Sequence, residues 1–321
     1  MTFDNAILWD CLRNARPDGS EAINKLMIKL SALALDWPVY TDKMNNLWID
    51  GGGSTLFCSH LDTVEIKEGT KEIYITDNNI HTKGLAVLGA DDGAGIGILS
   101  DMMIARVPGM YLFTQNEERG GTGGSYAAKY ESARIAHIQR AIAFDRCGTD
   151  EICGSQCVGT LASVQFVDAL SAALGLSHVW GQGTYTDNSE FMDIIPEIVN
   201  ISCGYSNNHS KNERLDFIYY QNLRDAAISV EWDNLPTIGP AINHKIDRFK
   251  MIDYSDNSGY LADDFIGDDD EIVTDTAWNI ADDLGINRNT WEFDAIKSHL
   301  EAMAFDIRAN CDDRADVFSR R

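Results

Sequence analysis

Seven side chains in this 321-residue sequence have the types and spacing of a metal centre. They stand directly after apolar runs or at a helix start, and they are His60, Asp62, Asp91, Glu117, Glu118, Asp145 and His209. Two imidazoles and several carboxylates form a mixed nitrogen and oxygen donor set that suits zinc. The donors exceed the needs of one tetrahedral ion and match two ions that share a bridging carboxylate. Asp62 lies two residues beyond His60, where it could accept a hydrogen bond from that imidazole and fix its tautomer.

The adjacent acids Glu117 and Glu118 are the pair on which this interpretation depends. Residues 110–113 form an apolar run, typical of a short buried strand, that leads into the two carboxylates and then into glycines. Neighbouring carboxylates repel each other, so they need either open solvent or a strong positive charge nearby. A solvated loop would explain the pair taken alone, whereas a bound cation explains it together with the other five side chains.

The elements that must position these side chains alternate between strand and helix, which predicts an α/β fold. We expect a mostly parallel, doubly wound sheet with helices on both faces. Strands of one direction end on one side of such a sheet, so the candidate ligands would meet at one edge. The expected strands are residues 39–41, 47–50, 55–58, 73–76, 110–113, 141–144 and 198–201. The expected helices are residues 20–35, a helix from the glycine-rich loop 88–95 through 103, one from about 124, residues 163–174 and residues 216–232.

Composition and charge restrict the class of partner. The net charge of -24 argues against a nucleic acid or an anionic membrane, because both repel a negative surface. No basic segment precedes an apolar run at the N-terminus, and no apolar run approaches about 18 residues, so we expect neither a signal peptide nor a spanning helix. Seven cysteines, an odd number, suit a reducing compartment better than a disulfide framework, and we expect a cytoplasmic protein.

A change in composition near residues 236–256 divides the chain in two. Pro236, Gly239 and Pro240 interrupt the pattern there. Residues 253–321 carry 18 acidic and 6 basic side chains. Their net charge of -12 is half of the net charge of the whole chain, -24. We therefore expect a main domain at residues 1–235 and an acidic, mainly helical C-terminal extension at 236–321. Two apolar stripes in the extension could pack on the main domain or on a partner.

The ordered series of motifs resembles the di-zinc exopeptidase clan, in its peptidase T-like and bacterial leucyl aminopeptidase-like branches. The series is His60-Leu61-Asp62-Thr63, Gly89-Ala90-Asp91-Asp92, Glu117-Glu118, Asp145 and His209, and residues 186–191, Pro196 and 204–209 are also similar. The resemblance covers roughly residues 20–233. It implies a zinc exopeptidase-like catalytic domain that hydrolyses peptide bonds at a chain end, most simply an aminopeptidase acting on short peptides. It also implies two zinc ions per chain, with cobalt or manganese as possible substitutes.

Carried over residue by residue, the resemblance implies that Asp91 bridges the two ions. His60 and Asp145 would complete one site, and Glu118 and His209 the other. Glu117 would be the general base, taking a proton from the activated water and delivering it to the leaving amine. Tyr185, Asp187 and Tyr205 flank the expected edge. A phenol there could donate to the oxyanion and an acid could receive the substrate's amino group, although loop packing explains all three equally well.

Three features depart from the clan. No lysine follows Asp91 and Asp92, and the acidic extension has no recognised counterpart. About 64 residues separate Asp145 from His209, too few for the inserted lid domain of the peptidase T-like branch. The short spacing favours a lidless aminopeptidase and removes the basis for a tripeptide preference.

Two other functions stay open. A deacylase or carboxypeptidase-type hydrolase could use the same metals with a cationic pocket, for which Arg119 and Arg146 are the candidates. A catalytically silent binding or scaffold protein could be built on the same fold.

The glycine-rich loop is not expected to bind a dinucleotide, because the carboxylates of Asp91 and Asp92 would repel the pyrophosphate. The sequence leaves the oligomeric state open.

Overall fold

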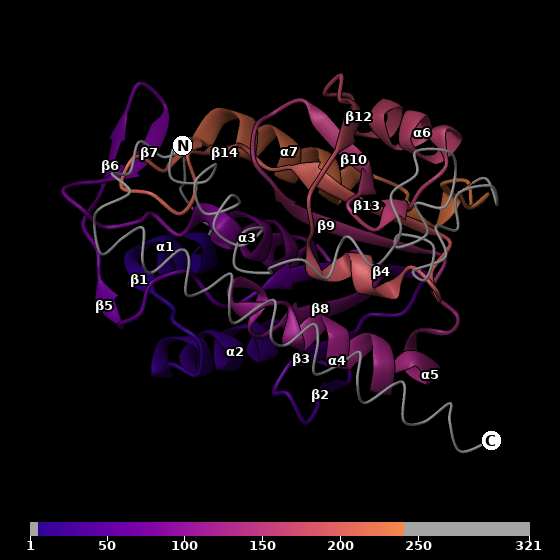
Figure 1. The fold of residues 1–321 in the computed structure, drawn as a ribbon, viewed down its shortest axis with the longest axis horizontal. Coiled ribbons are helices and arrows are strands. Elements are labelled where there is room, and N and C mark those ends of the chain that lie inside the picture. Colours follow the sequence, from indigo (N-terminus) through magenta and orange to yellow (C-terminus); the bar gives the residue numbers. More distant parts are fainter. Residues whose placement is uncertain (1–5, 241–321) are drawn as a thin grey trace, which may run out of the picture. The chain divides into compact units, whose positions relative to one another are not determined.

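A computed structural model describes residues 6–240, and its centre is a nine-stranded mixed sheet (Figure 1). The strands of this sheet are β2 Val39–Thr41, β3 Leu47–Asp50, β4 Thr55–His60, β8 Met110–Thr114, β9 Arg140–Arg146, β10 Glu151–Gln156, β11 Gly159–Thr160, β12 Val179–Gln182 and β13 Glu197–Ser202. Their order is β11-β10-β13-β9-β4-β8-β3-β2, and β12 pairs with β10. The central strands β13, β9, β4 and β8 run parallel, which brings their carboxyl ends to one edge.

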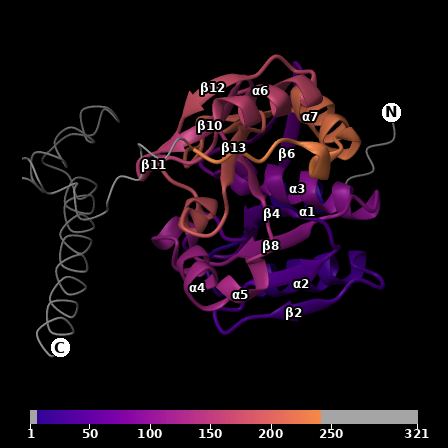
Figure 2. The same ribbon diagram turned by 90° about the vertical axis from the view of Figure 1, so that its right-hand side faces the viewer.

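Helices cover both faces of the sheet (Figures 1 and 2). They are α1 Ala6–Arg13, α2 Glu21–Leu33, α3 Ala90–Ile104, α4 Thr122–Tyr130, α5 Ser132–Ile135, α6 Val164–Leu174 and α7 Phe217–Ser229, with short 3₁₀ turns η1 Glu117–Arg119, η2 Asp187–Phe191 and η3 Trp232–Asn234. The helices α1, α2, α3, α6 and α7 pack on one face, and α4, α5 and η2 on the other. The fold class expected from the sequence is confirmed.

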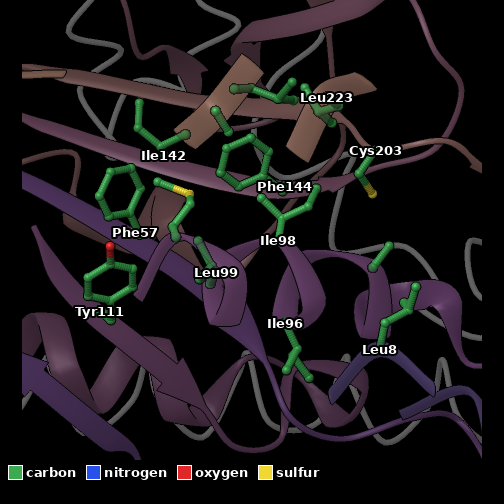
Figure 3. Packing of buried hydrophobic residues seen from close by; sticks show 14 of the residues in the cluster. Leu8, Phe57, Ile96, Ile98, Leu99, Tyr111, Ile142, Phe144, Cys203 and Leu223 are labelled. Atoms are coloured by element: carbon green, nitrogen blue, oxygen red, sulfur yellow. The ribbon is translucent and has the colours of Figure 1, made fainter. Parts of the chain in front are cut away.

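Alternating side chains of the central strands build the two layers of the core. In β4, Phe57 joins the cluster under α3, whereas its neighbours Leu56 and Cys58 join the cluster under α4 and α5. Figure 3 shows Phe57, together with side chains of β9, close to Leu99 of α3. Because strand side chains alternate with a period of two, a slip of one residue would exchange the two layers, so the core fixes the register that aligns the strand ends.

Two smaller sheets lie outside the central one. A four-stranded sheet has the order β14-β15-β7-β6, formed by β6 Ile73–Thr76, β7 Asn79–Thr82, β14 Tyr205–Ser206 and β15 Arg214–Asp216. Asn14–Ala15 (β1) pairs with Gly69–Thr70 (β5). Since β14 and β15 pair antiparallel, the loop between them, which carries His209, is a hairpin loop.

The expected elements are found with small shifts at their ends. Helix α2 begins at Glu21 because the Ser20 hydroxyl accepts a hydrogen bond from Ile23 N at 3.2 Å. Helix α7 ends at Ser229, three residues before the predicted end at 232. The sequence did not predict α1, β10 or β12, nor α5 and the short strands β1, β5, β7, β11, β14 and β15. Helix α1 has only eight residues, and β10 and β12 each contain an interior glycine that breaks the apolar pattern.

The chain between Asp145 and His209 forms no separate lid. It supplies β10, β11, β12 and β13 to the central sheet and α6 to the helical layer. The lidless arrangement expected from the short spacing is therefore present. In residues 6–240 no helix has the length and apolarity needed to cross a membrane. The predicted acidic extension, apart from residues 236–240, lies outside the described residues, and its boundary stays a prediction.

Residues 235–239 are held against the edge of the sheet opposite the candidate ligands. Arg140 and Glu197, the buried first residues of β9 and β13, are paired in register there. The Arg140 Nη2 donates to Leu235 O at 3.1 Å and to the Thr237 hydroxyl at 2.8 Å. The Glu197 Oε1 accepts hydrogen bonds from the main-chain nitrogens of residues 238 and 239, both at 2.8 Å. Residues 236–239, which the sequence analysis assigned to the extension, therefore make hydrogen bonds to the first residues of two central strands.

We expect a chain truncated after Trp232 to be less stable than one truncated after Pro240. The shorter chain leaves the buried charges of Arg140 and Glu197 without these partners, which should cost about 3–5 kcal/mol of unfolding free energy. Urea unfolding of the two truncated chains beside the full chain measures the difference. Equal unfolding midpoints for the two truncations would contradict the assignment.

Candidate metal centre

The candidate ligands meet at the carboxyl edge of the parallel strands. His60 is the last residue of β4, and Asp145 lies one residue before the end of β9. Glu118 follows β8 in the turn η1, and Asp91 is the second residue of α3. His209, with its side chain 48% exposed, comes from the β14–β15 loop. Three of these five segments meet because the strands that lead to them, β4, β8 and β9, are parallel. The start of α3 and the antiparallel β14–β15 hairpin bring the other two.

The Asp91 carboxylate lies between the two imidazoles. Its Oδ1 is 3.0 Å from His60 Nε2, and its Oδ2 is 3.1 Å from His209 Nε2. His60 Nε2 is also 3.6 Å from Asp145 Oδ1, and His209 Nε2 is 3.1 Å from Glu118 Oε1. Each oxygen of Asp91 therefore lies beside a different histidine, and each histidine lies beside a second carboxylate.

These separations are compatible with metal binding. Two ligands of one tetrahedral zinc ion, each bonded at about 2.0–2.1 Å, lie about 3.3 Å apart. Ligand atoms lie within 4.8 Å of one another in two groups, His60 with Asp91 and Glu118, and His60 with Asp92 and Asp145. In addition, the Oε1 atom of Glu118 is buried, and the His209 imidazole 3.1 Å away is its one polar neighbour among the described residues for which a close contact is found. A buried carboxylate oxygen with so few partners is costly, and a cation would satisfy it.

The charges of the site also call for a cation. Burial raises the pKa of Glu117 to about 9, and burial together with Asp91 raises the pKa of Asp145 to about 6. Hydrogen bonds to Asp91 and Glu118 raise the pKa of His209 to about 10. Burial by itself lowers the pKa of His60, but hydrogen bonds to Asp145, Asp62 and Asp91 outweigh it and raise that pKa well above its usual value. Without a metal the site holds protons, and a dication would displace them.

Asp62 supports the site in a way that the sequence predicted only in part. His60 Nδ1 lies 3.0 Å from the main-chain oxygen of Asp62 and 3.6 Å from its carboxylate. The carboxylate instead accepts hydrogen bonds from the main-chain nitrogens of Glu117 and Glu118, both at 3.1 Å. The carbonyl of Asp62 therefore holds the imidazole, and its side chain fixes the turn that carries the two glutamates.

Asp145 is oriented by its neighbours. The Thr186 hydroxyl donates to Asp145 Oδ2 at 2.7 Å, and the Tyr205 hydroxyl lies 3.3 Å from Oδ1. The side-chain amide of Asn200 bonds to both the main-chain nitrogen and the oxygen of Asp145, each at 2.9 Å. Tyr205, expected as a substrate-binding phenol, thus makes contact with a candidate ligand.

A cavity of about 260 Å³ opens onto this edge. Glu117, Asp145, Tyr185 and His209 are among its lining residues. Asp187, expected beside them, is buried behind the cavity, where its Oδ1 lies 3.5 Å from the Tyr185 hydroxyl. Burial raises the pKa of Asp187 to about 7. Tyr185 therefore lines the cavity, whereas Asp187 does not.

Sequence reasoning missed several supporting residues. Asn208 donates to Asp91 Oδ2 at 2.8 Å. Asp92, joined to Asp91 by a cis peptide bond, accepts hydrogen bonds from the Ser59 hydroxyl and from Gly95 N, so it caps α3. Arg16, fully buried, donates to Leu61 O at 2.8 Å and to Gly89 O at 3.4 Å, which joins the segments that carry His60 and Asp91. In the sequence, Asp92 and Asn208 are marked only by their position next to the candidate ligands Asp91 and His209. No sequence feature points to Arg16.

Two further kinds of possible metal ligand, a histidine and three cysteines, do not belong to the cluster, although Cys147 lines the cavity. His81 lies in the β6–β7 hairpin, where its Nε2 is 3.0 Å from the Thr76 hydroxyl. The three cysteines 147, 153 and 157 are free. No group of three possible ligands within residues 6–240 includes a cysteine.

Comparison with known proteins supports the fold. A scan against known protein families finds no match, and neither does a search of curated proteins. Among solved structures, Bacillus cereus aminopeptidase PepT matches with a TM-score of 0.57 at 16% identity, over 70% of this chain and 96% of that one. A Staphylococcus aureus tripeptidase matches with a TM-score of 0.57 at 16% identity, over 70% of this chain and 95% of that one. Pyrococcus horikoshii TET1 peptidase matches with a TM-score of 0.52 at 16% identity, over 70% of this chain and 98% of that one.

The domain has the zinc-exopeptidase fold. The resemblance noted in the sequence is thereby confirmed at the level of fold, since identities of 16% carry no more than that. In this zinc-exopeptidase fold the candidate ligands occupy the edge where open α/β sheets bind their ligands.

We expect zinc to stabilise the protein and the Asp91→Asn variant to lose most of that effect. A ligand at one hundred times its dissociation constant adds about 2.7 kcal/mol per site to the unfolding free energy. An asparagine cannot offer a charged oxygen to each of two ions. Thermal unfolding with zinc and with a chelator measures the shift, and His137→Ala, which alters an exposed histidine outside the cluster, is the control. An equal zinc-dependent shift in Asp91→Asn would rule out the bridging role.

Proposed function

We propose that this protein is a metal-dependent exopeptidase, an aminopeptidase that acts on short peptides. The observation that carries the proposal is the Asp91 carboxylate, which presents one oxygen to His60 and the other to His209 beside the cavity that Glu117 lines. The zinc-exopeptidase fold and the names of similar structures, an aminopeptidase and a tripeptidase, support the same reaction class.

The residues divide into two metal sites that share Asp91. His60 and Asp145 would hold one ion, and Glu118 and His209 the other, as the distances between their atoms allow. When bound, two zinc ions supply an acidified water and polarise the scissile carbonyl. Cobalt or manganese would suit the same donors.

Glu117 is proposed as the general base. Its carboxylate lines the cavity, and its main-chain nitrogen is held by Asp62, so its position relative to Glu118 is fixed. A carboxylate there can take a proton from the attacking water and later give it to the leaving amine. Tyr185, which lines the same cavity, can donate to the oxygen on which charge develops.

The negative charge of the site favours a substrate with a free amino terminus. Seven carboxyl groups lie around the two histidines: Asp62, Asp91, Asp92, Glu117, Glu118, Asp145 and Asp187. Burial raises the pKa of Asp92, Glu117 and Asp187, whereas a nearby cation favours the ionised form of each. A protonated α-amino group would be attracted by such carboxylates, whereas an N-blocked peptide would not. The deciding experiment compares free-amine and N-blocked peptides with and without chelator. Cleavage of N-blocked peptides at the same rate would exclude an aminopeptidase.

We expect Glu117→Gln and Glu118→Gln to differ sharply, although the residues are adjacent. Glu117→Gln should bind two equivalents of zinc and lose about 10²–10⁴-fold in turnover, because it removes proton transfer but no ligand. Glu118→Gln should bind less zinc. Metal analysis and peptide hydrolysis measure both effects. A metal-loaded Glu117→Gln protein with full turnover would remove Glu117 from the role of base.

One observation favours a second function, a hydrolase that recognises a substrate carboxylate. Arg146 is the single lysine or arginine that lines the cavity, within the described residues. Its Nε and Nη2 donate to Glu151 Oε2 at 3.0 and 2.8 Å, which holds the guanidinium in place, and Nη1 has no hydrogen-bond partner among residues 6–240. An arginine fixed in this way can bind a carboxylate. Arg119, the other candidate, does not line the cavity.

The Arg146→Met variant separates the two functions. If Arg146 binds the substrate's carboxyl end, Arg146→Met should raise KM for short peptides with a free carboxyl terminus about tenfold or more and leave KM for their amides unchanged, because a charged hydrogen bond contributes about 1.5–3 kcal/mol. If the protein is a simple aminopeptidase, both substrates should respond alike. Glu151→Gln, which frees the guanidinium without removing it, is the matched control.

We also propose that the protein works in the cytoplasm. The cysteines at positions 11, 58, 147, 153, 157 and 203 are all free, as expected in a reducing compartment.

A further inference from the structure

Glu213 is a buried acid that the sequence analysis did not identify as a site residue. It is 1% exposed and lies four residues after His209, just before β15. Its carboxylate accepts hydrogen bonds from three consecutive main-chain nitrogens. Gly89 N donates to Oε2 at 2.8 Å, and Ala90 N and Asp91 N donate to Oε1 at 2.9 and 3.1 Å.

These three nitrogens belong to a part of the chain that cannot satisfy them by itself. They precede the regular part of α3, because Asp91 and Asp92 have non-helical backbone angles, and Gly89 has φ +73°. The first nitrogens of a helix lack partners within it, and leaving them buried and unpaired is costly. Glu213 satisfies all three, so it sets the path of the main chain from which the Asp91 side chain extends.

We propose that Glu213 is a positioning residue for the metal centre: it holds residues 89–91 so that Asp91 directs one carboxylate oxygen to each histidine. The inference rests on the proposed two-metal site. The β14–β15 loop, which carries Glu213, contributes a second restraint on Asp91, because Asn208 donates to Asp91 Oδ2 at 2.8 Å. The segment that supplies His209 therefore also sets the backbone and the side chain of the shared ligand, which couples the two halves of the centre.

The consequence of losing this restraint differs from ordinary destabilisation. Glu213→Gln keeps the size of the side chain but replaces one carboxylate oxygen with an NH₂ group, which must face at least one main-chain N–H. Residues 89–91 should shift to relieve that contact, and the Asp91 carboxylate should shift with them. Because Asp91 is shared, both metal ions should bind more weakly. Loss of a group that orients a ligand typically costs about 10–100-fold in metal affinity.

Glu197 provides a matched control at the other edge of the sheet. It is fully buried, and it also accepts hydrogen bonds from three main-chain nitrogens, those of Ser163, Ile238 and Gly239. Its strand position, at the start of β13, is remote from the candidate ligands. Glu197→Gln should therefore lower the free energy of unfolding by the same mechanism without moving Asp91.

The test measures zinc affinity by competition with a chelator, and the absorption spectrum of the cobalt-loaded protein, for the full-length wild type and both variants. We expect Glu213→Gln to lose about tenfold or more in zinc affinity and to show a shifted cobalt spectrum. Glu197→Gln should keep wild-type values of both, although urea unfolding of the metal-free proteins shows that each variant is less stable.

Wild-type zinc affinity in Glu213→Gln would overturn the inference, and so would an equal loss of affinity in Glu197→Gln. If Glu213→Gln does not fold, Glu213→Asp is measured instead, since it keeps the charge and only shortens the side chain. A folded Glu213→Asp with wild-type zinc affinity would also overturn the inference. A wild-type protein that binds no zinc would instead refute the metal centre itself.

Discussion

The carboxylate of Asp91, held between two imidazoles, is the interaction on which the rest of the structure depends. It joins the end of β4, through His60, to the β14–β15 loop, through His209, at the point where α3 begins. Bringing those three segments together requires parallel central strands, a short connection into α3 and a hairpin that returns to the same edge. The central sheet provides the first requirement, and the small sheet of β14, β15, β7 and β6 provides the last.

The two edges of the sheet differ in whether their buried charged groups are paired within the chain. At the edge opposite the ligands, Arg140 and Glu197 start neighbouring strands, and the chain itself supplies their hydrogen bonds except at Arg140 Nε. At the ligand edge, carboxyl groups outnumber cationic side chains, and the buried Asp187 Oδ2 has no hydrogen-bond partner among the described residues. Burying like charges costs stability unless a counter-charge is bound. The hydrogen bonds at the first edge stabilise the domain. At the ligand edge the carboxylates repel one another, and a pair of dications would relieve that repulsion.

The residues around the ligands matter as much as the ligands. Asp62, Thr186, Asn208 and Glu213 each bond to a candidate ligand or to the main chain that carries one. Such partners fix ligand orientation and so affect metal affinity. Similar folds at 16% identity show that the scaffold tolerates wide change in sequence, so function must be argued from these local contacts. In this chain the contacts come from loops at the sheet edge, where the parallel strands end.

The sequence by itself determined the fold class and most strands of the central sheet, because short apolar runs are local signals that the core then satisfies. It also determined which residue types could bind metal, since those types stand where the predicted strands end. Only the tertiary structure decided that each Asp91 oxygen faces a different histidine, that Asp62 bonds to the turn of Glu117 and Glu118, and that Glu213 holds the chain before α3. The reason is physical. These contacts join residues more than 30, 50 and 120 positions apart, and their geometry depends on the exact path of loops, for which no local pattern in the sequence exists.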